Sequence, residues 1–238
     1  MIVQRAQVRV AVSALIVVVS MLVWPLLQNM IKEARPIRHV GVEGEFQYIS
    51  KEDIQSKIMP LIHDGYFAID LQEIQQAVMS LPWAEKVQVQ RIWPDGLNLR
   101  LYEQKPVVRW QENSLLNIRG EVFKPLNIEQ FKFLPALYGP AEQRQRLLEV
   151  MYGLSVGLMD QGLRLTEFRV SNRQSWLLTM ENGMTVQLGR FEPLSKLTLL
   201  LKAFVVSGNE LVNKIAYVDM RYPNGYAVRW RENEQMSW

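Results

Sequence analysis

The chain has 238 residues, with 27 lysines and arginines against 24 aspartates and glutamates, two histidines and no cysteine. The lack of cysteine excludes disulfides, thiolate catalysis and cysteine-ligated zinc, and neither histidine has the spacing of a metal site. The net charge of +3 comes from the first 38 residues, which hold five lysines and arginines and one glutamate. The other 200 residues sum to −1, which gives little support for a nucleic-acid surface, since that would need a clustered positive excess. We therefore expect no cofactor, no metal and no nucleic acid.

The first feature in chain order is an uncharged, apolar segment at residues 10–31, between Arg9 and Lys32. As a helix it would be about 33 Å long, enough to cross a hydrocarbon core of about 30 Å. The alternative is a cleaved signal peptide, which would have a shorter apolar core and small residues at the cleavage site, where this chain has Lys32. The segment therefore predicts an uncleaved transmembrane helix.

The orientation of this helix does not follow from charge, since basic residues flank both ends. Residues 1–9 are too short to form a domain, whereas about 200 residues follow the segment, and long domains translocate largely regardless of charge. We therefore expect residues 1–9 in the cytoplasm and the rest of the chain on the other side of the membrane.

Residues 37–105 alternate between strand and helix patterns. A short strand at 37–44 precedes two amphipathic helices that begin at Ser50 and Asp70, whose side-chain oxygens can cap first-turn amides. Two alternating strands then flank a Pro-Asp-Gly turn at 94–96, which predicts a hairpin. The order β-α-α-β-β predicts a small α+β domain whose helices cover one face of a three-stranded sheet.

Residues 106–231 predict a second, β-rich domain with an antiparallel sheet and packed helices. Two strands joined at Arg119-Gly120 come first, and a helix follows at 141–160. Asn182-Gly183 joins two alternating strands, as is typical of a type I′ turn. The expected buried residues of the first helix are Leu147, Leu148, Met151, Leu154 and Leu158, and those of a second helix at 191–205 are Leu194, Leu197, Leu201 and Phe204.

The segment Gly153-Leu154-Ser155-Val156-Gly157 matches the G-x-S-x-G nucleophile elbow. That motif requires a strand-to-helix turn and a later histidine. Here it falls inside a helical pattern, and no histidine follows it. The small residues therefore predict helix packing, and we expect the protein not to be an enzyme. A membrane-anchored hydrolase is the alternative in another functional class.

The last feature is a hairpin at 215–222 and 226–231, followed by a tail at 232–238. A terminal hairpin often leaves an exposed edge, whose free N–H and C=O groups can pair with a strand of another chain. Alternatively, Tyr222, Tyr226, Val228 and Trp230 are ordinary inward residues of the sheet, while Arg221 and Arg229 are solvated. The residues alone leave both interpretations open.

Motifs in both domains resemble the FtsQ/DivIB family of bacterial cell-division proteins. In the first domain these are Leu-Pro-Trp at 81–83, Trp-Pro-Asp at 93–95, and Leu-x-Leu-x-Leu-x-Glu-x-x-Pro-Val-x-Arg-Trp at 97–110. In the second they are Leu-Pro-Ala-Leu-Tyr-Gly-Pro at 134–140 and Tyr-Val-Asp-Met-Arg-Tyr at 217–222, followed by a glycine, a valine and a tryptophan at the family's spacing. The resemblance covers nearly the whole chain.

This resemblance implies a POTRA domain at 37–105 and a single-pass protein of the inner membrane, with its two domains in the periplasm at the division septum. It implies a non-catalytic scaffold of the divisome that links early and late septal assembly proteins. The second domain would bind FtsB, itself paired with FtsL, by strand addition at the final hairpin, and the POTRA domain would recruit other divisome proteins. A POTRA module for protein transport or outer-membrane assembly is the alternative.

The family's partner-binding positions transfer to the hairpin and to one neighbouring loop. Arg173 and Arg221 would act as forked donors to acidic partner residues. The full set of implied partner-binding residues is Arg173, Tyr217, Arg221, Tyr222, Asn224, Gly225, Tyr226, Val228 and Trp230.

Overall fold

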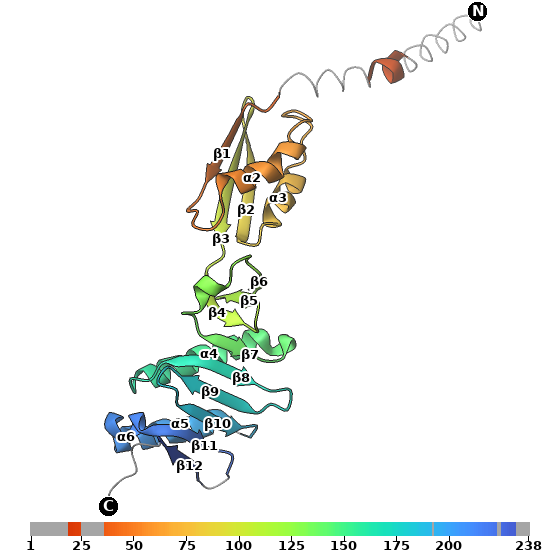
Figure 1. The fold of residues 1–238 in the computed structure, drawn as a ribbon. Helices are drawn as coiled ribbons and strands as arrows, with labels where there is room; N and C mark the ends of the chain where they lie inside the picture. Colours follow the sequence, from red (N-terminus) through yellow and green to blue (C-terminus); the bar gives the residue numbers. More distant parts are fainter. Residues whose placement is uncertain (1–18, 25–35, 192, 223–224, 232–238) are drawn as a thin grey trace, which may run out of the picture. The chain divides into compact units, whose positions relative to one another are not determined.

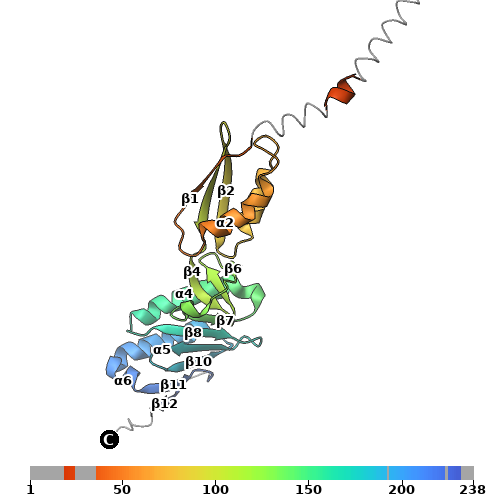
Figure 2. The same ribbon diagram turned by 45° about the horizontal axis from the view of Figure 1, so that its top comes forward.

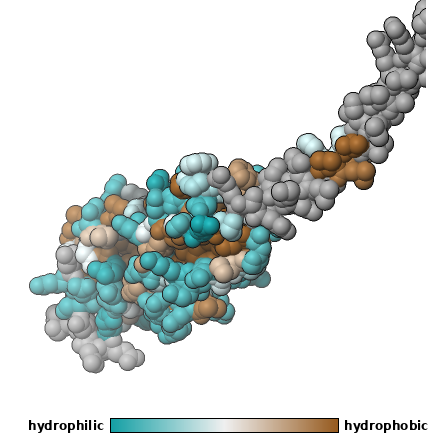
Figure 3. All heavy atoms as spheres, turned by 90° about the horizontal axis from the view of Figure 1, so that it is seen from above, coloured by the Kyte–Doolittle hydropathy of each residue, from teal (hydrophilic) through white to brown (hydrophobic). Residues whose placement is uncertain are grey.

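The computed structural model describes residues 19–24, 36–191, 193–222 and 225–231 (Figure 1). The chain divides into two units, one ending at Gln104 and one beginning at Lys105. The expected cytoplasmic segment 1–9, the tail 232–238 and most of the expected transmembrane segment 10–31 lie outside the described residues. Within the expected transmembrane segment, residues 19–24 are helical and expose apolar side chains (Figure 3). Among the residues that are described, we find no helix with the length and apolarity to span a bilayer.

Unit 1 has the expected β-α-α-β-β order. Its sheet has three strands in the order β1-β3-β2, with β1 parallel and β2 antiparallel to β3. Helices α2 and α3 lie side by side on one face of this sheet (Figures 1 and 2). The elements are β1 (His39–Glu43), α2 (Lys51–Ile58), a 3₁₀ turn η1 (Met59–Leu61), α3 (Leu71–Met79), β2 (Ala84–Ile92) and β3 (Gly96–Glu103).

The two helices begin at the predicted caps. The backbone N–H of Asp53 donates to Ser50 Oγ (3.0 Å), and the Ser50 N–H donates to the Asp53 carboxylate (3.1 Å), which together form a capping box. Asp70 accepts from the Gln72 N–H at 2.8 Å. Helix α2 ends at Ile58, because Pro60 has no N–H to donate and the chain tightens into η1.

Unit 2 contains a nine-stranded sheet in the order β12-β11-β10-β9-β8-β7-β4-β5-β6. Its elements are β4 (Pro106–Trp110), β5 (Ser114–Asn117), β6 (Val122–Phe123), η2 (Glu129–Phe131), β7 (Ala136–Tyr138), η3 (Ala141–Gln143), α4 (Arg144–Met159), β8 (Leu165–Val170), β9 (Trp176–Met180), β10 (Thr185–Gly189), α5 (Pro193–Ser207), α6 (Asn209–Asn213), β11 (Ile215–Asp219) and β12 (Ala227–Trp230).

The expectation of an antiparallel sheet in this unit is wrong, because the sheet is mixed. Strand β7 is parallel to both β4 and β8, and β10 is parallel to β11. Helix α4 connects β7 to β8, and α5 with α6 connects β10 to β11. A helical crossover returns the chain to the end at which it started, so that the next strand runs parallel. The helices are therefore crossovers as well as packing elements.

Helix α4 buries the five residues that its spacing predicts. The buried face of α5 is different from the expected one, since it consists of Leu197, Leu200 and Phe204, while Leu194 is exposed. Leu201 lies towards α4 at Gly157, where an added Cβ would come within 3.2 Å of the Leu201 Cδ1 atom. The small residue in α4 thus allows close helix packing.

The turn at Asn182-Gly183 joins β9 and β10 as expected, but it is not type I′. That type requires positive φ at both residues, and in this turn only Gly183, at +82°, has it. The Gly183 N–H donates to the Met180 carbonyl (2.9 Å) and the Met180 N–H to the Met184 carbonyl (2.8 Å). The connection is therefore a three-residue loop with glycine in the left-handed position, which accommodates one more residue than the predicted turn.

Candidate partner-binding edge

Strand β12 forms one edge of the nine-stranded sheet, and of the described strands only β11 pairs with it (Figure 1). The Arg231 N–H donates to the Lys214 carbonyl on the β11 side (3.0 Å). The backbone N–H and C=O groups of successive residues point to alternate sides of a strand. Those of Arg229, two residues before Arg231, therefore also point towards β11. The N–H and C=O groups of Val228 and Trp230 therefore point to the outer edge.

The side chains of β12 divide between the two faces of the sheet. Val228 and Trp230 are half-buried and pack against the hydrophobic core of unit 2, as the inward interpretation predicted. That interpretation is wrong for Tyr222 and Tyr226, which are exposed. Arg229 is exposed, and its guanidinium lies 5.4 Å from the ring centroid of Tyr217. This pairing covers the ring of Tyr217, whose pKa is raised by burial and by the charge of Asp219.

Arg221 follows β11 and forms a fork with Asp219. Its Nε donates to Asp219 Oδ1 (2.9 Å) and its Nη2 to Asp219 Oδ2 (2.6 Å), while its backbone N–H also donates to Oδ1 (3.0 Å). The Asp219 side chain is 9% exposed and that of Arg221 61% exposed. These hydrogen bonds lower the pKa of Asp219 below its ordinary value and raise that of Arg221. Asp219 therefore fixes the guanidinium while most of it stays accessible to a partner.

Gly189 at the end of β10 supports the same arginine. Its φ is +77°, and a Cβ there would lie 3.1 Å from the Arg221 Cγ atom. The aliphatic part of Arg221 thus rests on a position where only glycine fits without strain. Together, Gly189 and Asp219 hold Arg221 in one orientation.

Arg173 is exposed in the loop between β8 and β9. This loop adjoins Trp176, which pairs with Gly189 in the β9–β10 ladder. The loop is fixed to β10, because Gln187 Nε2 donates to Ser175 Oγ (2.8 Å). Arg173 and Arg221 therefore lie at the same end of the sheet.

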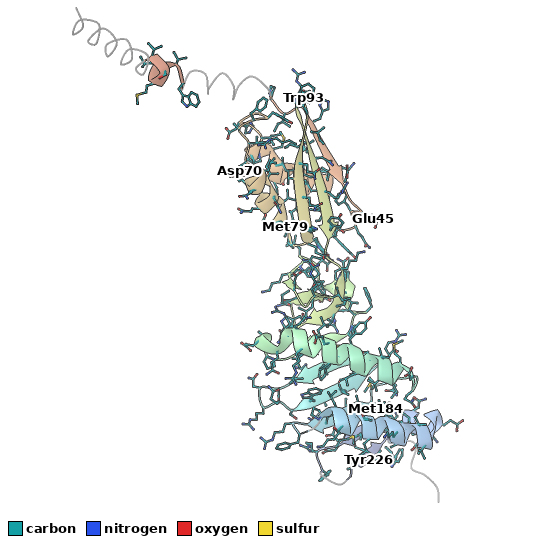
Figure 4. All side chains as sticks on the ribbon, turned by 180° about the vertical axis from the view of Figure 1, so that it is seen from behind. Glu45, Asp70, Met79, Trp93, Met184 and Tyr226 are labelled. Atoms are coloured by element: carbon teal, nitrogen blue, oxygen red, sulfur yellow. The ribbon has the colours of Figure 1, made fainter. Side chains whose placement is uncertain are left out.

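The turn between β11 and β12 is flanked by exposed aromatic side chains. Tyr222 is 57% and Tyr226 43% exposed, and Figure 4 places Tyr226 beside the last strands of unit 2. Gly225 is exposed as well. Asn224 lies outside the described residues. Of the sequence-derived set, the structure thus brings Arg173, Arg221, Tyr222, Gly225 and Tyr226 to one end of the sheet. Tyr217 and Val228 lie within the β11–β12 ladder, and Trp230 pairs with Ile215 at its opposite end.

Three positions of this surface were not predicted as site residues: Asp219, Gly189 and Arg229. The Asp-x-Arg spacing could have revealed the first, since residues two apart on an extended chain lie on one face. The role of Gly189 depends on a strand pairing that links positions far apart in the chain, and local sequence gives no signal for it.

The possible nucleophile Ser155 lies inside α4, as its helical pattern predicts. Its Oγ donates to the Met151 carbonyl one turn earlier (2.8 Å), a local bond common for serine within helices. Across the described residues there is no cluster of three or more histidine, aspartate or glutamate side chains that could hold a metal ion.

The chain is thus a two-domain α+β protein, in which a small β-α-α-β-β domain precedes a mixed-sheet domain with an edge strand. Residues 35–104 match the family described as POTRA domain, FtsQ-type, and residues 108–221 match the family described as Cell division protein FtsQ/DivIB, C-terminal. The second match ends at Arg221, before β12.

Relatives named Cell division protein FtsQ align with most of the chain. The protein from Methylomonas methanica is 39% identical over 216 residues, which are 90% of this chain and 87% of the relative. The proteins from Shewanella oneidensis and Neisseria meningitidis are 31% identical over 86% of this chain and 79% of the relative, and 30% identical over 91% and 90%, respectively. The chain belongs to the FtsQ/DivIB family of cell-division proteins, which confirms the resemblance seen in its motifs.

Proposed function

We propose that this protein is a non-catalytic scaffold of the divisome that binds FtsB, paired with FtsL, at the outer edge of β12. The observation that carries the proposal is the outward direction of the Val228 and Trp230 backbone groups beside a fixed, accessible Arg221. The FtsQ-type family match favours this role over POTRA-mediated transport or outer-membrane assembly.

Binding would occur by strand addition. A strand of the partner would exchange main-chain hydrogen bonds with Val228 and Trp230, which supply affinity, while side chains near the strand end select the sequence. The exposed part of the Arg221 guanidinium and Arg173 would receive acidic partner residues. Because Asp219 already occupies one side of the Arg221 fork, we expect the partner carboxylate to approach from the other side.

The apolar segment 10–31 would anchor the protein in the inner membrane, with both units in the periplasm at the septum. The exposed apolar side chains of residues 19–24 support this role, since they suit a hydrocarbon environment. Confinement to the membrane raises the effective concentration of the protein for other membrane-tethered divisome proteins. Surfaces of the POTRA domain would recruit further components.

Strand addition can be tested by removing one outward N–H. Val228→Pro deletes this donor without removing a bond to β11, and proline is tolerated on the open side of an edge strand. A synthetic extracytoplasmic segment of FtsB is titrated by calorimetry into the full chain in detergent micelles, with circular dichroism as the folding check. We expect Val228→Pro to lose binding while staying folded.

Two variants serve as controls for this experiment. Val228→Thr keeps the backbone N–H and the β-branched shape, so it should bind like the wild type. Arg229→Pro removes a bond to β11 and should therefore disturb the hairpin itself. Wild-type affinity in folded Val228→Pro would exclude strand addition at β12, and failure of the wild type to bind would exclude the FtsB segment as the partner.

A further inference from the structure

An exposed apolar tip lies at one end of unit 1. In the turn between β2 and β3, Trp93 is 75% exposed, and the adjoining Ile92 is 50% exposed. Figure 4 shows Trp93 at one extreme of the unit, with Glu45 and Met79 towards the other. Large apolar side chains are rarely left this exposed together unless the surface contacts something.

The loop before α3 adds a third apolar side chain to this end. Arg91, next to Ile92, donates from Nε to the Tyr66 carbonyl (3.0 Å) and from Nη2 to the Ile69 carbonyl (2.7 Å). These bonds hold the loop against the end of β2. Phe67, between the two acceptors, is 55% exposed. We call Phe67, Ile92 and Trp93 the apolar tip.

Hydrogen bonds join the β2–β3 turn of the apolar tip to the first residues of unit 1. The Arg38 N–H donates to the Asp95 carbonyl (3.0 Å), and His39 pairs with Gly96 at the beginning of the parallel β1–β3 ladder. Only six residues lie between Ile31, the end of the proposed anchor, and Arg38. Fully extended, the stretch from Ile31 to Arg38 spans at most about 25 Å. The tip is therefore confined to the vicinity of the bilayer that holds the anchor.

The chemistry of this end suits a lipid surface. Tryptophan is enriched at membrane–water interfaces, where its ring is buried and its N–H stays in a polar layer. The sequence places Lys32, Arg35 and Arg38 between the anchor and the tip, and basic residues at this level are attracted to anionic headgroups. Asp95 opposes them, but its carboxylate lies 3.8 Å from the Arg38 guanidinium, which offsets its charge.

We propose that the apolar tip inserts into the interface of the same bilayer that holds residues 10–31, as a second membrane contact of the protein. The inference rests on the proposed anchor. A single helix leaves the domain that follows it free to rotate, whereas two contacts fix which end of unit 1 faces the lipid. The opposite end, where Tyr102 lies, is then directed away from the membrane.

The absence of cysteine makes a site-specific test direct. Ile92→Cys is labelled with an environment-sensitive fluorophore, which leaves Trp93 in place, and the full chain is reconstituted into vesicles of equal parts phosphatidylcholine and phosphatidylglycerol. Tyr102→Cys is the matched control, since it is an exposed position at the far end of the same β2–β3 pair. Emission is recorded with and without spin-labelled lipids that quench at the headgroup and upper acyl level.

We expect blue-shifted emission and lipid quenching for the label at Ile92, and neither for the label at Tyr102. Adding Trp93→Ala to the Ile92→Cys chain should abolish the shift while the protein still floats with the vesicles. Flotation without quenching at Ile92 would overturn the tip contact and leave the anchor intact. Failure of the chain to float would overturn the anchor and with it this inference.

Discussion

Two hairpins with similar turn sequences occupy different positions in the sheets of the two units. The β2–β3 turn reads Trp93-Pro94-Asp95-Gly96, and the β11–β12 turn reads Tyr222-Pro223-Asn224-Gly225, so both combine an aromatic residue, proline, Asp or Asn, and glycine. In unit 1 the returning strand β3 lies between β1 and β2, whereas in unit 2 the returning strand β12 lies at the sheet edge. The returning strand of a hairpin is thus central or at the edge according to whether another strand pairs with its outer side.

The side chains of the central strand β3 are more deeply buried than those of the edge strand β12. Leu97, Leu99 and Leu101 of β3 are at most 2% exposed, while Val228 and Trp230 of β12 are only half-buried. Each hairpin also carries an arginine paired with a carboxylate. Arg100 on β3 bonds to Glu43 on β1 and so joins two strands, whereas the Arg221–Asp219 fork is local and leaves the neighbouring strand edge open.

The strongest test of this contrast is a matched pair of core truncations. Leu99→Ala should lower the free energy of unfolding of unit 1 by about 2–5 kcal/mol, because it leaves a cavity in a closed site. Val228→Ala should cost unit 2 only about 1 kcal/mol, since the edge position is half-solvated already. Urea denaturation followed by tryptophan fluorescence and circular dichroism measures both. Equal losses would contradict the distinction between central and edge strands.

A second prediction concerns the fork. Asp219→Ala removes the acceptor that holds Arg221, so it should lower the free energy of unfolding of unit 2 by about 1–3 kcal/mol and weaken binding of the FtsB segment. Glu43→Ala is the counterpart in unit 1 and removes an exposed pair, so it should change stability less and leave FtsB binding unchanged. If both variants bind FtsB like the wild type, the fork has no role in recognition.

Gly189 should be sensitive for conformational reasons. Gly189→Ala places a Cβ at positive φ against the Arg221 Cγ atom, which should cost about 1–2 kcal/mol of stability and displace the guanidinium. Gly153→Ala is the control, since a Cβ there meets no atom within 4 Å and alanine favours the helix by about 0.5–1 kcal/mol. Thermal unfolding should therefore shift in opposite directions in the two variants.

The smallest expected effect is a pH dependence. The pKa of Asp219 is lowered in the folded state, chiefly by its hydrogen bonds with Arg221. Its contribution to stability is thus fully present above the ordinary pKa of 3.8 and is lost as pH falls through the lower, folded-state pKa. Asp219→Asn should flatten the acid limb of unit 2 stability. An unchanged acid profile in this variant would show that the carboxylate does not stabilise the fold by this route.

Local patterns were sufficient for the elements that depend on short-range chemistry. The caps at Ser50 and Asp70, the buried stripe of α4 and the final hairpin all follow from spacing and hydrogen-bonding groups within a few residues of one another. The site residues on that hairpin followed from motif resemblance, and the structure adds Asp219, Gly189 and Arg229 to their surroundings.

The sequence by itself determined the order of elements in unit 1, the hairpins and two long helices of unit 2, and the family, whereas β7, β8 and α6 did not follow from local patterns. Only the tertiary structure decided which strands are neighbours, because pairing between distant segments depends on the path of crossover connections and not on the strands' own composition. That pairing makes the sheet of unit 2 mixed, places Gly189 under Arg221, and leaves β12 at the edge of the sheet among the described strands.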